Sequence, residues 1–326
     1  MKRVLITGGT GFVGANLAEA LLRQGTEVRI LRRRSSDLRA IAGIDARHYL
    51  GDIRDPASLK EAIHTCDTVF HTAAIVKYWK ARWEEQLAVN VEGTSNVITA
   101  CLSEGVTRLV HVSSIAALGH PQHQLLADEE TPYNWPEEPG YKYSKRLAEL
   151  KVLKGVKKGL NAVIVNPSVI IGERDINFHG GSLLTNARKG TTLFYIDGGM
   201  NVVYVGDVVK GMIRAAERGR CGERYILGGV NMTTREAFTR TAELVGGRTP
   251  VARIPIPVLH TVTKLVEATF GFLGKEPPIT MDLMVNAGIY NWYSSAKAER
   301  ELGYTVTPFD ETILAAYRWY RENGYL

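Results

Sequence analysis

Short apolar segments alternate with helix-length segments through the first half of the chain, which predicts strands and helices in turn. The first segment, Val4 to Ile6, is apolar throughout, as expected of a strand buried on both faces. Leu17, Leu21 and Leu22 then recur at helical spacing. Strands are predicted at 4–6, 27–31, 47–50, 68–71, 108–113 and 162–165, and helices at 56–64, through 89 and 98, and at 141–158. This rhythm predicts an α/β fold with a doubly wound parallel sheet of the Rossmann type.

The composition of the chain changes at Gly172, beyond which predicted loops, aromatic residues and prolines predominate. A chain of 326 residues exceeds the range in which one hydrophobic core keeps growing. We therefore predict a dinucleotide-binding domain over 1–171 and a smaller substrate-binding lobe over 172–326. Short strands at 202–205 and 224–227 and a helix at 308–323 are expected to return to the main sheet, so that the two lobes interleave.

The segment from Ile254 to Leu273 is the nearest approach to a membrane span, but His260, Lys264 and Glu267 interrupt it. We predict a helix that lines a pocket or covers a core, the alternative being a helix on a membrane surface. No run of about eighteen uninterrupted apolar residues occurs, so no integral membrane segment is expected. The first predicted strand begins almost at once, which argues against a signal peptide and favours a cytoplasmic protein.

Composition narrows the range of functions. Apolar residues make up 45% and charged residues 23% of the chain, as in ordinary globular proteins. The net charge of +6 comes from 40 basic residues mixed with 34 acidic ones, without an arginine-rich tail, so we expect no nucleic-acid partner. Cys66, Cys101 and Cys221 are far apart and lack metal-ligand spacing, which indicates a reducing compartment and no metal site.

The first strand runs directly into a glycine-rich turn. Gly8, Gly9 and Gly11 allow a tight turn with φ > 0 and a close approach of the backbone, and Gly14 lets the next helix pack near the strand. The N–H groups at the start of that helix would face a pyrophosphate. Ordinary turns also use glycines in this way, so the motif alone leaves the ligand open.

Basic residues follow the second strand, where a protein that binds unphosphorylated NAD normally has an acid. Arg32 and Arg33 favour the 2′-phosphate of NADP, because guanidinium groups form charge-assisted hydrogen bonds with phosphate. The alternative is a solvated run of charge. In an open α/β sheet ligands lie beyond the carboxyl ends of the strands, so these positions are informative.

The third and fourth strands end in residues suited to a dinucleotide. Asp52 offers a carboxylate to the adenine amino group, and the small side chains of Ala73 and Ala74 let a dinucleotide lie flat. Asn90 is a candidate polar anchor in the helix behind the fourth strand. For His71, at the end of that strand, we expect a structural role with local hydrogen bonds.

Two serines and a tyrosine-lysine pair follow the fifth strand. Ser113 and Ser114 end the strand, and a spacing of four places Tyr141 and Lys145 on one face of the next helix. There an ammonium would lower the pKa of the phenol and bring it nearer the working pH. A serine hydroxyl nearby would hold a substrate oxygen beside the phenol. Tyr143 is an internal control, since no basic residue stands four positions after it.

Seven motifs together resemble the extended short-chain dehydrogenase/reductases, especially bacterial dihydroflavonol-reductase-like proteins and hopanoid-associated sugar epimerases. They are TGGTGFVG, GDIRD, HTAA, NVEGT, HVSSIAALG, YKYSK and NPSVIIG, and the resemblance is specific over the first 230 residues. It implies that Tyr141 is the catalytic acid/base and that Lys145 assists it and binds the nicotinamide ribose. Ser114, five residues before Gly119, matches the serine that bonds the substrate oxygen. Many such proteins form homodimers through the helix that carries the tyrosine.

The predicted cofactor is NADP(H), with NAD(H) as the second possibility. By the resemblance, Pro167 and Val169 pack against the nicotinamide. The residues expected to contact the dinucleotide are Gly8, Gly11, Phe12, Val13, Gly14, Arg32, Arg33, Asp52, Ile53, Ala73, Ala74, Asn90, Tyr141, Lys145, Pro167 and Val169.

Three functions remain open at this stage. The first is an NADPH-dependent reductase of a ketone or aldehyde on a small, hydrophobic or ring-containing substrate. Four aromatic residues near the predicted cleft would suit such a substrate, although they could equally be ordinary packing residues: Tyr78, Trp79, Trp83 and Trp135. The second is an NDP-sugar epimerase or dehydratase with tightly bound NAD, whose diphosphate four arginines could clamp: Arg174, Arg188, Arg248 and Arg253. The third is a non-catalytic dinucleotide sensor, which the presence of Tyr141, Lys145 and Ser114 disfavours.

Overall fold

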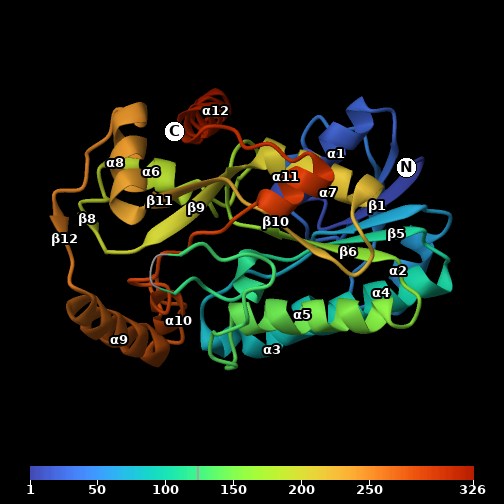
Figure 1. Cartoon of the computed structure of the whole chain (residues 1–326), viewed down its shortest axis with the longest axis horizontal. Coiled ribbons are helices and arrows are strands. Elements are labelled where there is room, and N and C mark those ends of the chain that lie inside the picture. Colours follow the sequence, from blue (N-terminus) through green and yellow to red (C-terminus); the bar gives the residue numbers. More distant parts are fainter. Residues whose placement is uncertain (123–124) are drawn as a thin grey trace.

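A seven-stranded parallel sheet forms the centre of the computed structural model, which describes residues 1–122 and 125–326 (Figure 1). The strand order is β10-β6-β5-β4-β1-β2-β3. The strands are β1 (Arg3–Thr7), β2 (Glu27–Arg32), β3 (Arg47–Leu50), β4 (Thr68–His71), β5 (Arg108–Val112), β6 (Ala162–Pro167) and β10 (Arg224–Leu227). The doubly wound α/β fold is confirmed. The order reverses between β1 and β4, which marks the expected ligand crevice.

Helices cover both faces of this sheet and bury a separate core on each side (Figure 1). One face carries α1 (Phe12–Arg23), α7 (Val205–Arg218) and α11 (Ala296–Leu302), and the other carries α2 (Pro56–Ile63), α4 (Gly93–Ser103) and α5 (Tyr141–Val156). The long helix predicted through Val89 and Ile98 is present and contains a π-helical segment: α3 (Trp83–Gln86) continues through Leu87–Glu92 into α4. Short 3-10 turns lie at Arg39–Ile41, Lys80–Arg82 and Ile115–Ala117.

The second lobe is built on a small three-stranded sheet of order β11-β9-β7 with its own core. Its strands are β7 (Val169–Ile171), β9 (Gly199–Tyr204) and β11 (Val230–Thr233), and a two-stranded pair joins β8 (Phe194–Tyr195) to β12 (Ala252–Arg253). Its helices are α6 (Ser182–Lys189), α8 (Thr234–Val245), α9 (Ile256–Phe272), α10 (Met281–Met284) and α12 (Phe309–Glu322).

Two of the segments expected to return to the main sheet do not do so. The predicted strand at 202–205 is part of β9, which pairs with β7 and β11, and the C-terminal helix α12 packs against α8 and the small sheet. Only α7 and β10 lie within the main layers, with β10 pairing with β6. A short apolar strand can pair in either sheet, so its composition does not select the partner.

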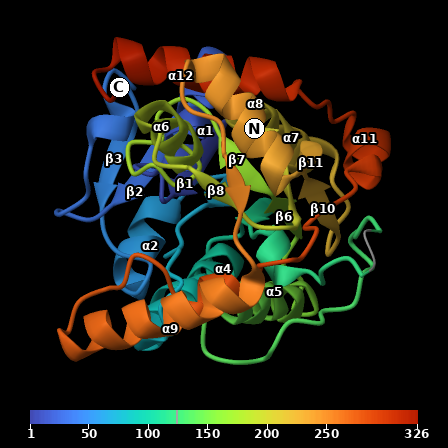
Figure 2. The same ribbon diagram turned by 90° about the vertical axis from the view of Figure 1, so that its left-hand side faces the viewer.

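The segment at 254–273 forms α9, as predicted, but it does not cover a core. Thr263 is the buried residue of this helix, and α9 contributes to none of the described hydrophobic clusters. It packs against α10 and otherwise lies at the periphery of the molecule (Figure 2). Within the described residues, no helix is both long and apolar enough to cross a bilayer.

Arg108 ties the later half of the chain to the main sheet. This buried side chain, at the start of β5, donates to the carbonyls of Ala215 (2.9 Å), Ala216 (3.1 Å) and Gly219, at the C-terminal end of α7. It also donates to Asn161 Oδ1 at 2.5 Å. The Ala215 carbonyl also accepts the Gly219 N–H at 3.0 Å. The last carbonyls of a helix lack N–H partners further along it, so a cation there satisfies the others and complements the helix dipole.

We expect Arg108→Met to lower the free energy of unfolding by about 3 kcal/mol, because it leaves buried carbonyls without donors. Urea denaturation measures this loss. Arg23→Met is the matched control, since Arg23 is exposed and bonds only Glu19 one turn away in a surface pair; we expect a change below about 0.5 kcal/mol. Equal effects of the two substitutions would contradict the role given to Arg108.

Candidate active site

The glycine turn brings β1, α1 and the segment after β4 into direct contact. Gly8 has a φ of 71°, and a Cβ on it would lie 2.6 Å from the Ala73 nitrogen. A Cβ on Gly14 would lie 2.4 Å from the Gly8 carbonyl oxygen. Among the three glycines of the predicted turn, only Gly8 has a positive φ, so the other two serve close approach rather than a left-handed conformation.

The N-terminus of α1 is open to an anion. Gly11 is the N-cap residue and contributes no side-chain hydrogen bond, so the first N–H groups of the helix, on Phe12, Val13 and Gly14, lack a side-chain cap. A Cβ on Gly11 would meet only the Gly8 carbonyl oxygen, at 3.3 Å. Uncovered donors at the positive end of a helix dipole fit the pyrophosphate of a dinucleotide.

The predicted adenosine-binding residues lie together at the ends of β2 and β3, whose chains are joined by a hydrogen bond from Gly51 N–H to the Arg32 carbonyl. Arg32 donates through Nε to His48 at 3.1 Å. Asp52 forms an ion pair with Arg54 at 2.7 Å, which holds the pKa of its carboxyl below the ordinary value, and the charge of Arg33 adds to this effect. A carboxylate still has free acceptor sites when one arginine binds it, so Asp52 keeps the capacity expected of it. The following residue, Ile53, is buried.

The polar residues around β4 are structural. His71 is bonded to Thr7 Oγ1 at 2.7 Å and to Thr94 Oγ1 at 2.9 Å, and burial lowers its pKa to about 3. The expected structural role of His71 is confirmed. Asn90 accepts the Ile75 N–H at 2.8 Å, and its amide nitrogen donates to the Ile75 carbonyl and to Ser144 Oγ.

Asn90 therefore acts on the site through the segment that it holds. Both N–H donors of its amide are engaged by protein groups, so the part it plays is to fix the residues after β4, including Ala73 and Ala74, against α5. The sequence motif placed Asn90 near the dinucleotide but did not reveal these partners.

The tyrosine-lysine pair lies at the start of α5, beside the end of β5. Tyr141 is buried, and the neighbouring Ser114 side chain opposes part of the rise that burial causes in its pKa. Lys145, one turn further, donates to the Val112 carbonyl at 2.9 Å. Ser114 Oγ also accepts the Ala116 N–H at 3.1 Å, which fixes its rotamer. Phenol, hydroxyl and ammonium thus converge from two elements.

Burial dominates the electrostatics of this pair. It raises the pKa of Tyr141 to about 12, and the Ser114 hydrogen bond only partly offsets the rise. It lowers the pKa of Lys145 to about 8, against the opposing charge of Glu149. The expectation that Lys145 brings the pKa of Tyr141 down is therefore wrong for this arrangement, since the ammonium is directed at the Val112 carbonyl.

A buried polar network that the sequence did not reveal supports Ser114. Asn166, in β6, donates to the Ser114 carbonyl at 2.9 Å and to Glu149 Oε1 at 2.6 Å. Glu149 is in turn paired with Arg224 at 3.0 Å. The sequence feature that could have revealed this network is a glutamate on the buried face of α5, because a buried carboxylate requires a partner.

Asp282, from the second lobe, lies at the start of α5. Burial raises the pKa of its carboxyl, and the charge of Lys142 and then the backbone N–H of Tyr141 oppose this rise. A Cβ on Gly140 would lie 3.0 Å from Asp282 Oδ2, so the glycine before Tyr141 leaves room for this contact. Lys142 donates to Asn286 at 2.8 Å in the same region. The second lobe therefore positions the first turn of α5.

The aromatic residues near the predicted cleft divide by role. Tyr78 meets the Tyr141 ring edge-on, with centroids 5.3 Å apart, whereas Trp83 stacks on Tyr143 and Trp135 is buried beneath the Lys142 ammonium. Only Tyr78 of these contacts the catalytic tyrosine. Pro167 is buried at the end of β6, and Val169 is 39% exposed where the chain enters the small sheet.

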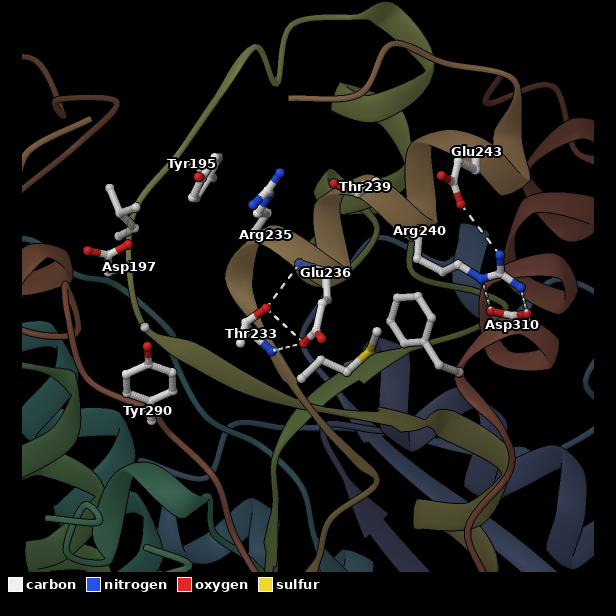
Figure 3. A pocket seen from close by; sticks show the side chains of 14 residues that line it. Tyr195, Asp197, Thr233, Arg235, Glu236, Thr239, Arg240, Glu243, Tyr290 and Asp310 are labelled. Carbon is white, nitrogen blue, oxygen red and sulfur yellow. Dashed lines mark hydrogen bonds and ion pairs between the residues drawn. The ribbon is translucent and has the colours of Figure 1, made fainter. Parts of the chain in front are cut away.

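A cavity of about 740 Å³ opens in the second lobe, over the start of α8 (Figure 3). Neither Tyr141 nor Ser114 is among its described lining residues. Its charged lining comprises Asp197, Arg235, Glu236, Arg240, Glu243 and Asp310. Four carboxylates thus face two guanidinium groups, and Arg240 is itself paired with Asp310 and Glu243. This charge balance does not suit a diphosphate.

Residues 4–228 match the model of the NAD-dependent epimerase/dehydratase family. The chain belongs to this family. It is 32% identical to a putative dihydroflavonol 4-reductase of Synechocystis, over 98% of this chain and 95% of that protein. It is also 32% identical to a 4-hydroxy-2-methyl-3-oxo-4-farnesyl-3,4-dihydroquinoline-1-oxide ketoreductase of Stigmatella aurantiaca, over 93% and 91%.

A solved structure of a nucleoside-diphosphate-sugar epimerase from Pseudomonas aeruginosa has the same fold, with a TM-score of 0.82, 27% identity and coverage of 100% and 99%. The chain is thus an NAD(P)-dependent oxidoreductase of the extended short-chain dehydrogenase/reductase type. Its relatives include both reductases and epimerases, so membership of the family leaves the reaction open.

We expect Lys145→Met to raise the free energy of unfolding at pH 7 by about 2 kcal/mol. The substitution removes the cost of burying an ammonium group, which is larger than the stabilisation lost with its hydrogen bond. The pKa of Lys145 is lowered to about 8 on folding, so the penalty is complete below pH 8. It disappears as the pH rises toward the unfolded value of about 10.4. The gain should therefore shrink at pH 10.

Urea denaturation at the two pH values measures this difference. Lys154→Met is the matched control, because Lys154 is an exposed lysine of the same helix, and it should change the free energy of unfolding by less than about 0.5 kcal/mol. A loss of stability for Lys145→Met at pH 7 would show that the ammonium stabilises the fold.

Proposed function

We propose that this protein is an NADPH-dependent reductase of a ketone or aldehyde on a small, hydrophobic or ring-containing molecule. The observation that carries the proposal is the buried Tyr141 beside Ser114, with the Lys145 ammonium one turn away. Two hydroxyl groups at one point can together hold a single carbonyl oxygen. The ketoreductase and reductase names of its relatives point to the same chemistry.

A nicotinamide dinucleotide, when bound, supplies the hydride. Ser114 donates a hydrogen bond to the carbonyl oxygen and orients it. Tyr141 then donates its proton to that oxygen as negative charge develops there. A phenol whose burial raises its pKa to about 12 stays protonated at neutral pH, which suits the acid of a reduction. Burial keeps water from the proton transfer.

Arg32 and Arg33 support the choice of the phosphorylated cofactor. Arg32 is the last residue of β2 and Arg33 follows it, while Asp52 comes two residues after the end of β3. The Arg32 side chain donates to His48, and the Arg54 side chain pairs with Asp52. The charged side chains around Arg33 are therefore fixed by contacts within the protein. A ribose 2′-phosphate at this position would meet guanidinium groups rather than an acid.

The epimerase alternative rests on the family description and on the sugar-epimerase structure with the same fold. It requires basic groups that clamp a diphosphate, and three of the four candidate arginines have protein partners. Arg174 bonds the Ala40 carbonyl and pairs with Glu19, Arg188 donates to the Gly246 carbonyl, and Arg253 pairs with Asp197. These contacts favour the reductase.

The sensor alternative lacks a comparable observation in its favour. A protein that only binds a dinucleotide has no need of an acid held in place by several elements. Tyr141 lies beside Ser114, the Ser114 carbonyl accepts a hydrogen bond from Asn166, and Asp282 lies against Gly140 at the start of the same helix. These contacts support catalysis.

We expect Tyr141→Phe to reduce turnover by about 100-fold or more, because it removes the proton donor, while the affinity for NADPH stays nearly unchanged. Turnover is followed as loss of nicotinamide absorbance with a panel of ketones and aldehydes, and affinity by titration. Tyr143→Phe is the matched control, since Tyr143 lies on the same helix but stacks on Trp83. Retention of more than a tenth of the wild-type rate by Tyr141→Phe would exclude its catalytic role.

We expect Arg33→Ala to weaken NADPH binding by about tenfold or more while changing NADH binding little, because a charge-assisted bond to the 2′-phosphate is lost. Titration with the two cofactors measures this ratio. Arg39→Ala serves as the control, because the Arg39 guanidinium is already paired with Asp37 at 2.7 Å. An equal loss for NADPH and NADH would mean that Arg33 does not meet the 2′-phosphate. Purification with tightly bound NAD would instead favour the epimerase.

A further inference from the structure

Helix α9 lies at the periphery of the molecule (Figures 1 and 2), and its outer face is exposed and apolar. Five large apolar residues line it, with exposed fractions of 54% for Val258, 46% for Val262, 65% for Leu265, 92% for Phe272 and 58% for Leu273. Their spacing of three to four residues places most of them on one side of the helix. Apolar side chains gathered in this way mark an interaction site more often than scattered ones do.

The opposite face of α9 has the contacts that fix the helix to the protein. Thr263 is buried there, and Glu267 accepts the Met281 N–H at 2.9 Å at the start of α10. Just beyond the helix, Glu276 forms an ion pair with Lys77 at 2.9 Å. The helix is therefore held with a defined face outward, and both acids of the segment are engaged.

The charge that remains on this surface is positive. Lys264 and Lys275 are exposed, and within the described chain neither forms an ion pair. The apolar stripe thus has two available ammonium groups beside it, while the segment's acids have partners. Apolar residues with lysines at their margin suit the boundary between acyl chains and anionic headgroups.

We propose that α9 lies on anionic lipid bilayers, with its axis in the plane of the membrane and its outer face among the headgroups. At 17 residues with Lys264 and Glu267 in its length, the helix lies on the surface rather than crosses it. The surface docks the enzyme beside lipid, and α9 packs against α10, which places Asp282 at the start of α5. The docking itself does not depend on the proposed reaction.

The test is co-sedimentation of the purified full chain with vesicles of phosphatidylcholine alone or mixed with an equal part of phosphatidylglycerol. The wild type should bind the mixed vesicles, and added salt should release it because screening weakens the lysine contacts. Leu265→Glu should weaken binding roughly tenfold. Lys264→Ala should weaken it roughly fivefold on the mixed vesicles and have little effect on phosphatidylcholine.

Leu314→Glu is the matched control, because Leu314 is a 40% exposed leucine on α12 at the far side of the molecule, and it should bind as the wild type does (Figure 1). Phe272→Ser provides a second variant, since a 92% exposed ring contributes little to folding, and it too should weaken binding. Absence of wild-type binding to the mixed vesicles overturns the proposal. It is also overturned if Leu265→Glu and Phe272→Ser bind the vesicles as tightly as the wild type does. A third contrary outcome is that either variant elutes as a smaller particle than the wild type in lipid-free gel filtration, which would mean that a second copy covers α9.

Discussion

The hydrogen bond from the Lys145 ammonium to the Val112 carbonyl is the contact on which the site depends. It joins α5 to the end of β5, and so places Tyr141, one turn earlier, beside Ser114, two residues beyond the strand. The same contact requires a cation to be buried. Burial lowers the pKa of Lys145 to about 8 and raises that of Tyr141 to about 12, so the site holds a ready acid at a cost in stability.

Both lobes take part in holding this arrangement. From the main sheet, Asn166 bonds the Ser114 carbonyl and Glu149, whose charge opposes the fall in the pKa of Lys145. From the second lobe, Asp282 lies against Gly140, immediately before Tyr141 and the first turn of α5. The segment that carries Asp282 is fixed in turn to α9 through Glu267. A helix on the surface of the protein is therefore linked to the turn that carries Tyr141.

Local patterns were sufficient for much of the first half of the chain. A strand followed by Gly8 and Gly14 predicts a close turn because only residues without a Cβ fit there, and the distances from their hypothetical Cβ atoms agree. His71 was assigned a structural role, and its bonds to Thr7 and Thr94 confirm it. The helix predicted at Tyr141 begins at that residue. Each of these features depends on residues that are close in sequence or on a position at the end of a strand.

The sequence by itself thus determined the parallel α/β sheet, the glycine turn and the helix that bears Tyr141 and Lys145, because hydrophobic periodicity and backbone sterics act over short distances. Only the tertiary structure decided that β9 and α12 belong to the small sheet, that Asp282 lies at the start of α5 and that α9 faces outward. It also reversed the expected shift in the pKa of Tyr141, because desolvation depends on what the whole fold packs around a group rather than on a neighbour four residues away.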